Sequence, residues 1–208
     1  MKRVEPFERH TERYDDWFER HPAAYETEVD ALRPLVDDGV GLEVGVGTGR
    51  FAVPLDVRHG VDPSRRMLEV ARERGIVVTQ GVAESLPYRD GVFDVVLVVT
   101  TICFVDDVSE TLSEAARVLG EDGAAVLGYV DSESQLGRRY REEKEDNPFY
   151  SDASFLSTDD VLRELEDAGF TSCDVVQTLF DPPEDLTEPQ ETRPGHGEGS
   201  FVGVRARL

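Results

Sequence analysis

The stretch LEVGVGTGRFAVPL (Leu42–Leu55) decides the fold of this chain. A short apolar run leads into three glycines, Gly45, Gly47 and Gly49, that alternate with small residues. Glycine adopts positive φ angles and lets a backbone approach a ligand closely. Open α/β sheets bind ligands outside the carboxyl ends of their strands. The stretch therefore predicts a ligand-binding loop after the first strand of an α/β sheet.

The glycine spacing argues against two common nucleotide-binding loops. The dinucleotide fingerprint is G-x-G-x-x-G, and here Arg50 stands where that pattern has its last glycine. The P-loop fails as well, because no Gly-Lys-Ser/Thr sequence follows. What remains is E-x-G-x-G-x-G, led by Glu43, and a nucleotide or a nucleoside is the natural ligand for such a loop.

Pro54 predicts an unusually short first helix after the loop. Proline is tolerated only in the first turn of a helix, because it lacks an N–H and clashes with the preceding turn. Only twelve residues separate Gly49 from Asp62. We expect about one and a half helical turns, followed directly by the second strand.

Short apolar runs alternate with helical patterns along the rest of the chain. Strands are expected over 40–45, 58–62, 76–81, 93–104, 124–130, 173–180 and 200–208. Helices are expected over 1–36 with a break at Pro22, over 64–75, from Val108 to Leu119, and from Ser157 to Gly169. Ser157 and Asp160 predict a capping box. Near-continuous Val/Ile/Leu strands indicate a sheet covered on both faces, so the fold class is α/β, doubly wound, in a single domain over 1–208.

The charge balance excludes some classes of partner. The chain has 44 acidic residues against 22 Lys+Arg, for a formal net charge of −22. A nucleic-acid binder needs basic surface, so we expect no nucleic-acid partner. Only Lys2 and Lys144 are lysines. An acid-rich, lysine-poor chain is typical of halophilic archaea, where salt screens the self-repulsion; an ordinary acidic protein is the alternative.

The remaining composition indicates a cytoplasmic protein. No apolar run reaches the roughly 18–20 residues of a membrane span, so we expect no membrane partner. The N-terminal MKRVEPFERHTERY lacks the apolar core of a secretory signal. Cys103 and Cys173 lie far apart and match no metal-ligand spacing, so we expect reduced thiols and no metal.

Acidic side chains lie at the ends of the first three expected strands. Asp62 ends the second, where a carboxylate can accept hydrogen bonds from both ribose hydroxyls of a nucleoside. Ala83 and Glu84 follow the third, where a backbone N–H and an acidic side chain can read an adenine edge. Each acid alone is more simply a solvated loop charge. Their joint placement with Glu43 at neighbouring strand ends favours a nucleoside site.

Four stretches stand in the motif order of a known family: LEVGVGTGRFA, GVDPSRRMLEVAR, GVAESLPYRDGVFDVVLVVTTICFV and EAARVLGEDGAAVLG. Together they span about residues 40–130, and the chain resembles a class I S-adenosylmethionine-dependent methyltransferase. The closest likeness is to small archaeal and thermophile-type members of the ubiquinone/menaquinone-methyltransferase-like group. The resemblance implies a Rossmann-like seven-stranded sheet in the order 3-2-1-4-5-7-6, mostly parallel with an antiparallel last strand and helices on both faces.

The resemblance also implies a cofactor site for S-adenosyl-L-methionine. The glycine loop would wrap the methionine moiety, Asp62 would hold the ribose, and Glu84 would lie near the adenine. Glu43 would be structural or would reach the methionine amino group through water. The implied cofactor-binding residues are Glu43, Gly45, Gly47, Thr48, Gly49, Asp62, Pro63, Ala83, Glu84 and Thr100.

The acceptor is expected to be a small molecule methylated by in-line displacement, over the ends of the first, fourth and fifth strands. Candidate acceptor-pocket residues are Tyr14, Trp17, Thr100, Thr101, Tyr129 and His196. The N-terminal helical segment 1–36 and the segment 132–155 are expected lids, although the aromatic face of the first can equally be core. His196 lies in RPGHGEGSF (193–201), which can equally be a flexible hairpin connection.

Two other functions remain open from the sequence. One is a non-catalytic S-adenosylmethionine-binding module that regulates a partner. The other is a nicotinamide-dependent reductase, which the glycine spacing disfavours. The oligomeric state is expected to be monomer or homodimer.

Overall fold

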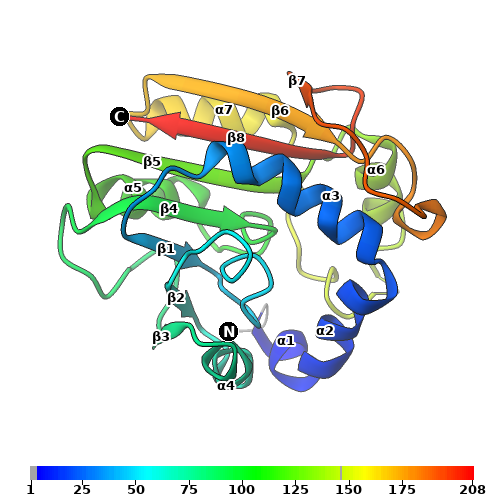
Figure 1. The fold of residues 1–208 in the computed structure, drawn as a ribbon, viewed down its shortest axis with the longest axis horizontal. Coiled ribbons are helices and arrows are strands. Elements are labelled where there is room, and N and C mark those ends of the chain that lie inside the picture. The colour runs from blue at the N-terminus through cyan, green and yellow to red at the C-terminus, as the bar shows by residue number, and fades with distance from the viewer. Residues whose placement is uncertain (1–3, 146) are drawn as a thin grey trace.

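The computed structural model describes residues 4–145 and 147–208. Its strands form one sheet in the order β3-β2-β1-β4-β5-β8-β6-β7 (Figure 1). The strands are β1 (Gly41–Val44), β2 (His59–Asp62), β3 (Val77–Gln80), β4 (Phe93–Val99), β5 (Leu119–Val130), β6 (Ser172–Thr178), β7 (Arg193–Pro194) and β8 (Phe201–Arg207). β1 to β5 pair in parallel, and β8 pairs antiparallel with both β5 and β6.

The predicted strand order is confirmed, with one strand more than expected. The additional strand is β7, which pairs antiparallel with Val176 and Gln177 of β6 at the sheet edge. It has two residues, too few to show an alternating sequence pattern.

Helices cover both faces of the sheet (Figure 1). They are α1 (Glu5–Arg9), α2 (Thr11–Arg20), α3 (Pro22–Leu32), α4 (Arg65–Glu73), α5 (Val108–Val118), α6 (Gln135–Glu142) and α7 (Thr158–Asp167), with 3-10 turns η2 (Arg33–Leu35) and η3 (Pro183–Asp185). The predicted capping box of Ser157 and Asp160 is present at the start of α7. None of the described helices is long and apolar enough to cross a membrane.

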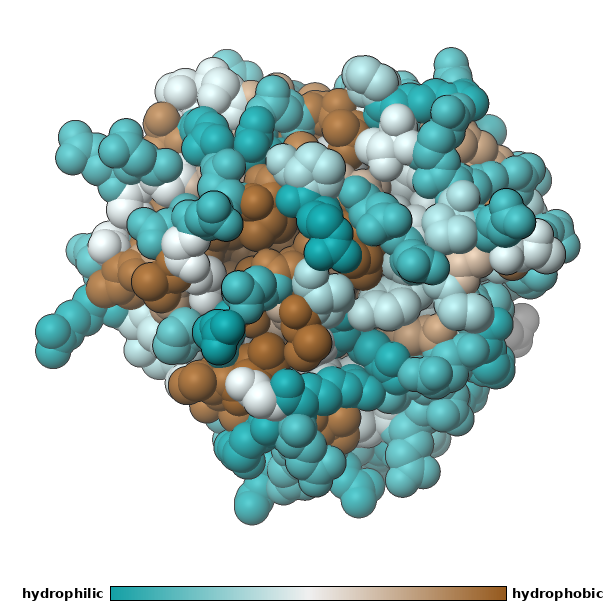
Figure 2. All heavy atoms as spheres, in the orientation of Figure 1, coloured by the Kyte–Doolittle hydropathy of each residue, from teal (hydrophilic) through white to brown (hydrophobic). Residues whose placement is uncertain are grey.

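Alternation along β4 builds two hydrophobic clusters. Val96 and Val98 pack into a cluster with α5 and α7, whereas Val95, Leu97 and Val99 pack into one with α2, α3 and α4. This is the period of two expected for a strand that is buried on both faces. Hydrophilic side chains cover most of the outer face seen in Figure 2, with hydrophobic patches between them.

The segment after the glycine loop forms turns and no helix. The Val53 N–H donates to the Gly49 carbonyl and the Leu55 N–H to the Phe51 carbonyl, each at 3.2 Å. Pro54 has no N–H to give to the Arg50 carbonyl, which accepts the Tyr25 hydroxyl instead. The predicted helix of one and a half turns is therefore wrong in type, although the short connection to β2 is present.

Two other boundaries differ from the prediction. The strand expected over 93–104 ends at Val99, because Thr100 has a φ of +48° that a strand does not accommodate. The strand expected from 124 begins at Leu119, directly after α5, so Leu119, the expected last residue of the helix, lies in β5.

Candidate functional site

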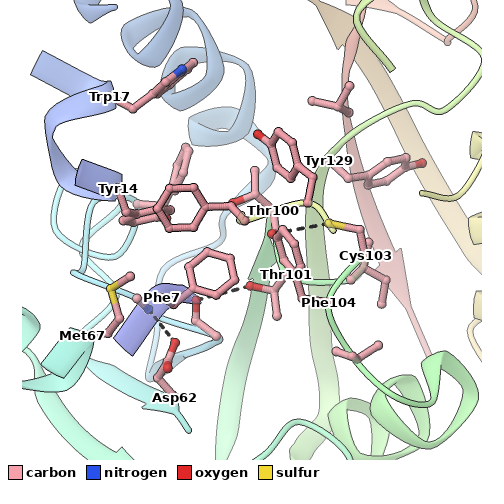
Figure 3. A pocket seen from close by; sticks show the side chains of 18 of the residues that line it. Phe7, Tyr14, Trp17, Asp62, Met67, Thr100, Thr101, Cys103, Phe104 and Tyr129 are labelled. Carbon is pink, nitrogen blue, oxygen red and sulfur yellow. Dashed lines mark hydrogen bonds between the residues drawn. The ribbon is translucent and has the colours of Figure 1, made fainter. Parts of the chain in front are cut away.

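A cavity of about 540 Å³ opens at the carboxyl ends of β1, β4 and β5. Figure 3 shows Tyr14 and Phe7, from the N-terminal helices, across this pocket from Thr100, Thr101 and Cys103 after β4. Carboxyl strand ends are where open α/β sheets bind ligands.

Most of the sequence-predicted site residues lie at this cavity. Those predicted to bind the cofactor and found in its lining are Gly45, Gly47, Asp62, Pro63, Ala83, Glu84 and Thr100. Those predicted for the acceptor and found there are Tyr14, Trp17, Thr100, Thr101 and Tyr129. Glu43, Thr48 and Gly49 are buried behind the lining.

The glycine loop has the backbone that its sequence predicts. Gly45, Gly47 and Gly49 have φ angles of +70°, +52° and +82°. A Cβ at Gly45 would overlap the Thr101 side chain, and one at Gly47 would lie 3.5 Å from the Tyr14 hydroxyl oxygen. Glycine at the first of these positions is therefore required both by conformation and by space.

Both carboxylate oxygens of Asp62 accept backbone hydrogen bonds that fix the side chain against the loop. Oδ2 accepts the Gly47 N–H at 3.0 Å, and Oδ1 accepts the Ser64 N–H at 2.8 Å. Burial raises the pKa of Asp62 to about 6, although these two backbone hydrogen bonds act to lower it. A carboxylate has room for about four hydrogen bonds, so Asp62 retains acceptor capacity toward the cavity.

Glu43 is a buried acid behind the loop. It is 1% exposed, and its Oε2 atom has no hydrogen-bond partner among the described residues. Burial raises the pKa of Glu43 well above its ordinary value. Burial therefore favours the neutral form of this carboxyl, and a compensating charge from a ligand would favour the ionised form.

Glu84 lines the cavity and also holds a neighbouring loop. Its Oε1 accepts the Asp106 N–H at 2.6 Å and the Asp107 N–H at 3.4 Å. These amides precede α5, whose N-terminus Asp107 caps. Glu84 thus fixes the wall of the cavity next to Ala83, a role that its position after β3 did not reveal.

His196, predicted beside the acceptor pocket, is not among the residues that line the cavity. Its Nε2 lies 3.9 Å from Oδ1 of Asp159, at the start of α7. The Gln177 side chain accepts the N–H groups of Glu198 and Gly199, each at 2.8 Å. These bonds and the β7 pairing tie the connection to the sheet edge.

A cluster around Asp15 was not predicted from the sequence. Asp15, on α2, accepts hydrogen bonds from Thr48 Oγ1 at 2.7 Å, Arg50 Nε at 2.9 Å and an Arg74 guanidinium N–H at 2.8 Å. Burial acts to raise the pKa of Asp15, but the hydrogen bonds from Arg74, Arg50 and Thr48 outweigh it and hold the pKa well below its usual range. The cluster joins α2 to the glycine loop and α4. Its one sequence signal is Arg50, in place of the fingerprint glycine.

We expect Asp15→Asn to lower the free energy of unfolding by about 1–3 kcal/mol at pH 7, because it removes the charge that two arginines share. A group with a depressed pKa stabilises the fold above its unfolded pKa and loses that effect as the pH falls. The deficit should therefore shrink below about pH 4. Urea unfolding at pH 3, 5 and 7 measures it. Asp16→Asn, on the exposed side of the same helix, is the control, and equal effects of both variants would contradict a role for the cluster.

Aromatic rings from distant segments also line the cavity. Phe7 in α1 lies 4.9 Å from Phe104 and 5.2 Å from Phe149, centroid to centroid. Tyr140 and Tyr150 rings lie 4.8 Å apart. Both the N-terminal helices and the segment after α6 therefore supply apolar surface to the cavity.

Comparison with known proteins identifies relatives over the whole chain. A family model described as a methyltransferase domain matches residues 42–127. The crystal structure of a Thermotoga maritima SAM-dependent methyltransferase, described as a possible histamine N-methyltransferase, is similar with a TM-score of 0.97 and 48% identity over 99% of both chains. An uncharacterised protein of Methanocaldococcus jannaschii is 40% identical over 96% of this chain and 97% of its own. A ubiquinone/menaquinone biosynthesis C-methyltransferase of Geotalea uraniireducens is 32% identical over 41% of this chain and 43% of its own.

Proposed function

The chain belongs to the class I S-adenosylmethionine-dependent methyltransferases, and on that premise we propose that the cavity binds the cofactor at its glycine-loop end and a small-molecule acceptor at its aromatic end. The enzyme uses S-adenosyl-L-methionine as its methyl donor. The observation that carries the proposal is the single cavity, which joins the glycine loop and Asp62 to the aromatic rings.

Features of the loop fit this cofactor. A Cβ at Gly45 would overlap the Thr101 side chain, so glycine lets the loop lie directly against Thr101 in the wall of the cavity. Asp62 retains acceptor capacity for hydroxyl groups, and Oε2 of Glu43 is a buried polar atom without a protein partner among the described residues. We assign the loop glycines, Asp62 and Glu43 to the cofactor on these grounds.

The bound sulfonium supplies an activated methyl group. The protein's contribution is therefore to align the acceptor for in-line displacement and to exclude water. The aromatic contacts of Phe7 with Phe104 and Phe149 support a cover over the reacting centre. We propose that the segments 1–36 and 132–155, of which the structure describes all but residues 1–3 and 146, act as lids that admit the acceptor.

Calorimetric titration with S-adenosylhomocysteine and with NADH tests the cofactor assignment. We expect binding of the first and none of the second. The reverse result would support the nicotinamide-dependent alternative. A screen of amines, histamine among them, thiols, phenols and quinone precursors then tests turnover. Binding of the cofactor without transfer to any acceptor would favour the regulatory module.

We expect Asp62→Ala to weaken S-adenosylhomocysteine binding by about 1–3 kcal/mol, because hydrogen bonds to a charged group are lost. Titration calorimetry measures the change, and the melting temperature shows that the variant is folded. Asp122→Ala, at an exposed position, is the control. Unchanged affinity in Asp62→Ala would remove this residue from the ribose role.

From the strongly acidic composition we propose that this is a cytoplasmic protein of a halophile. Under this proposal the chain is more stable at 2 M than at 0.1 M KCl, because salt screens its −22 net charge. A melting curve at both concentrations tests it, and equal stability would count against salt adaptation.

A further inference from the structure

One buried acid at the aromatic end of the cavity is not used by the cofactor assignment. Glu28, in the middle of α3, lines the cavity and is 5% exposed. Its carboxylate makes no hydrogen bond or ion pair with any described residue. Leu32, one turn later on the same helix face, is fully buried over the sheet. A carboxyl at such a core-facing position is unfavourable unless something compensates it.

The cations of the cavity wall do not provide that compensation. Three arginines line the cavity, Arg13, Arg20 and Arg139, and none of them pairs with Glu28. Arg139 is instead bound by the carboxylate of Glu184 in η3, which raises the pKa of the guanidinium further. The acid at this end therefore faces the cavity without a protein cation.

Three tyrosine hydroxyls interact with Glu28, and one imidazole lines the same cavity. Burial first, and the charge of Glu28 second, raise the pKa of Tyr140 to about 12. Burial also raises the pKa of Tyr14 and of Tyr150, with Glu28 among the smaller causes. These phenols stay neutral at any pH used below. His21 lines the same part of the cavity, with its Nδ1 at 3.0 Å from the Trp17 carbonyl oxygen.

An acid among aromatic rings is a site for a cation. Aromatic faces attract a cation within about 6 Å of the ring centre. Trp17 stacks on His21 with centroids 4.9 Å apart, and the ring of Tyr150 lies 5.6 Å from that of Phe155. All four rings line the cavity. A carboxylate and aromatic rings together select a positively charged group over a neutral or negative one.

We propose that Glu28 binds the acceptor, that the acceptor is a small primary or secondary amine with an apolar body, and that the Glu28 carboxylate takes the proton that the ammonium must lose. This rests on the proposed methyltransferase function and names its substrate class. An ammonium nitrogen has no lone pair and cannot attack carbon. Transfer of one proton from nitrogen to Glu28 frees the lone pair.

The proton and electron balance closes with the groups named. The amine nitrogen forms a bond to the methyl carbon as the carbon–sulfur bond breaks, and the electron pair of that bond stays on sulfur. The nitrogen regains a positive charge, and the sulfur loses its own. Glu28 keeps the proton removed from the amine, which restores the protonated carboxyl of the free protein, so the one net proton of the reaction is the one released to solvent when the ammonium binds.

Burial raises the pKa of Glu28 to about 8, so the free carboxyl is largely protonated at pH 7. When an ammonium ion binds beside Glu28, the bound pair keeps one proton fewer than the free ammonium ion and the free, protonated carboxyl carried together. Binding at pH 7 should therefore release roughly one proton. An alcohol of the same shape should release none.

Titration calorimetry on protein saturated with S-adenosylhomocysteine tests the proposal. The probes are 2-phenylethylamine and tryptamine, with 2-phenylethanol and tryptophol as neutral counterparts. Titrations in phosphate and in Tris at pH 7 give the proton count, because the buffers differ in ionisation enthalpy. We expect the amines to bind more tightly than the alcohols and to release about one proton in the wild type.

Glu28→Gln keeps the shape and removes the ionisable group. We expect its amine affinity to fall by about 10- to 100-fold, as for loss of a hydrogen bond to a charged group, with the proton release abolished and alcohol binding unchanged. Glu26→Gln, the same change at an exposed position of α3, should behave as wild type. Proton release from any group other than Glu28 would persist in Glu28→Gln.

S-adenosylhomocysteine affinity, measured first on each protein, reports the fold and the cofactor assignment independently of Glu28. Its absence in the wild type would overturn the proposed function. With that affinity intact, amines that bind no better than their alcohol counterparts would overturn the proposal for Glu28. So would a Glu28→Gln protein that keeps both the amine affinity and the proton release.

Discussion

Gly45→Ala is expected to destabilise the protein by about 2–4 kcal/mol and to reduce S-adenosylhomocysteine affinity by about 100-fold or more. Two effects add. The residue has a φ of +70°, which an alanine adopts only with strain. The new Cβ would also overlap the Thr101 side chain, including the Thr101 Cβ at 2.8 Å, which cannot rotate away. To relieve this overlap, the loop must move away from the segment that follows β4, at the end of the cavity assigned to the cofactor.

Gly75→Ala separates the two effects. Gly75 has a φ of +90°, and nothing lies within 4 Å of an added Cβ. This variant should show only the conformational strain of about 1–2 kcal/mol and normal affinity. Urea unfolding and titration calorimetry on both variants measure the comparison. Equal destabilisation by the two substitutions, with affinity retained in Gly45→Ala, would show that the loop tolerates displacement from Thr101.

Glu28→Gln is expected to make the ligand-free protein more stable than the wild type at pH 8, by roughly 3–4 kcal/mol. The folded-state pKa of Glu28 is about 8, against 4.5 for the unfolded chain. The folded state therefore binds the Glu28 proton more tightly than the unfolded chain does. The stability that this proton contributes is fully present below about pH 4.5 and is lost as the pH rises toward 8. Glutamine has no proton to lose, so the difference in the free energy of unfolding between Glu28→Gln and the wild type should widen by about 1.4 kcal/mol per pH unit.

Urea unfolding of wild type, Glu28→Gln and Glu26→Gln between pH 4.5 and 8 measures this gap. Asp62 and Glu43 also have raised pKa values, and all three proteins share them, so the difference isolates Glu28. Glu26→Gln should track the wild type. A constant difference between Glu28→Gln and wild type across the range would mean that Glu28 ionises in the folded protein as it does in the unfolded chain.

The acceptor end of the site was harder to predict than the cofactor end. Tyr14, Trp17 and Tyr129 lie in the cavity as expected, but His196 does not. Its position depends on the pairing of β7 with β6, which involves two residues and leaves no periodic pattern. Glu28 was not singled out, because one glutamate in a chain with 44 acidic residues has no distinguishing sequence feature.

The sequence by itself determined the strands, the glycine loop and the acid at the end of β2, whereas the order of the strands followed from the resemblance to a known family. The first three depend on local properties, namely apolar runs, the φ angles open to glycine, and the short span between Gly49 and Asp62. Only the tertiary structure decided which charges are paired and which are buried alone. Asp15 meets arginines 35 and 59 residues away, whereas Glu28 meets none. Pairing and burial depend on what packs against a side chain from distant segments, and no local pattern records that.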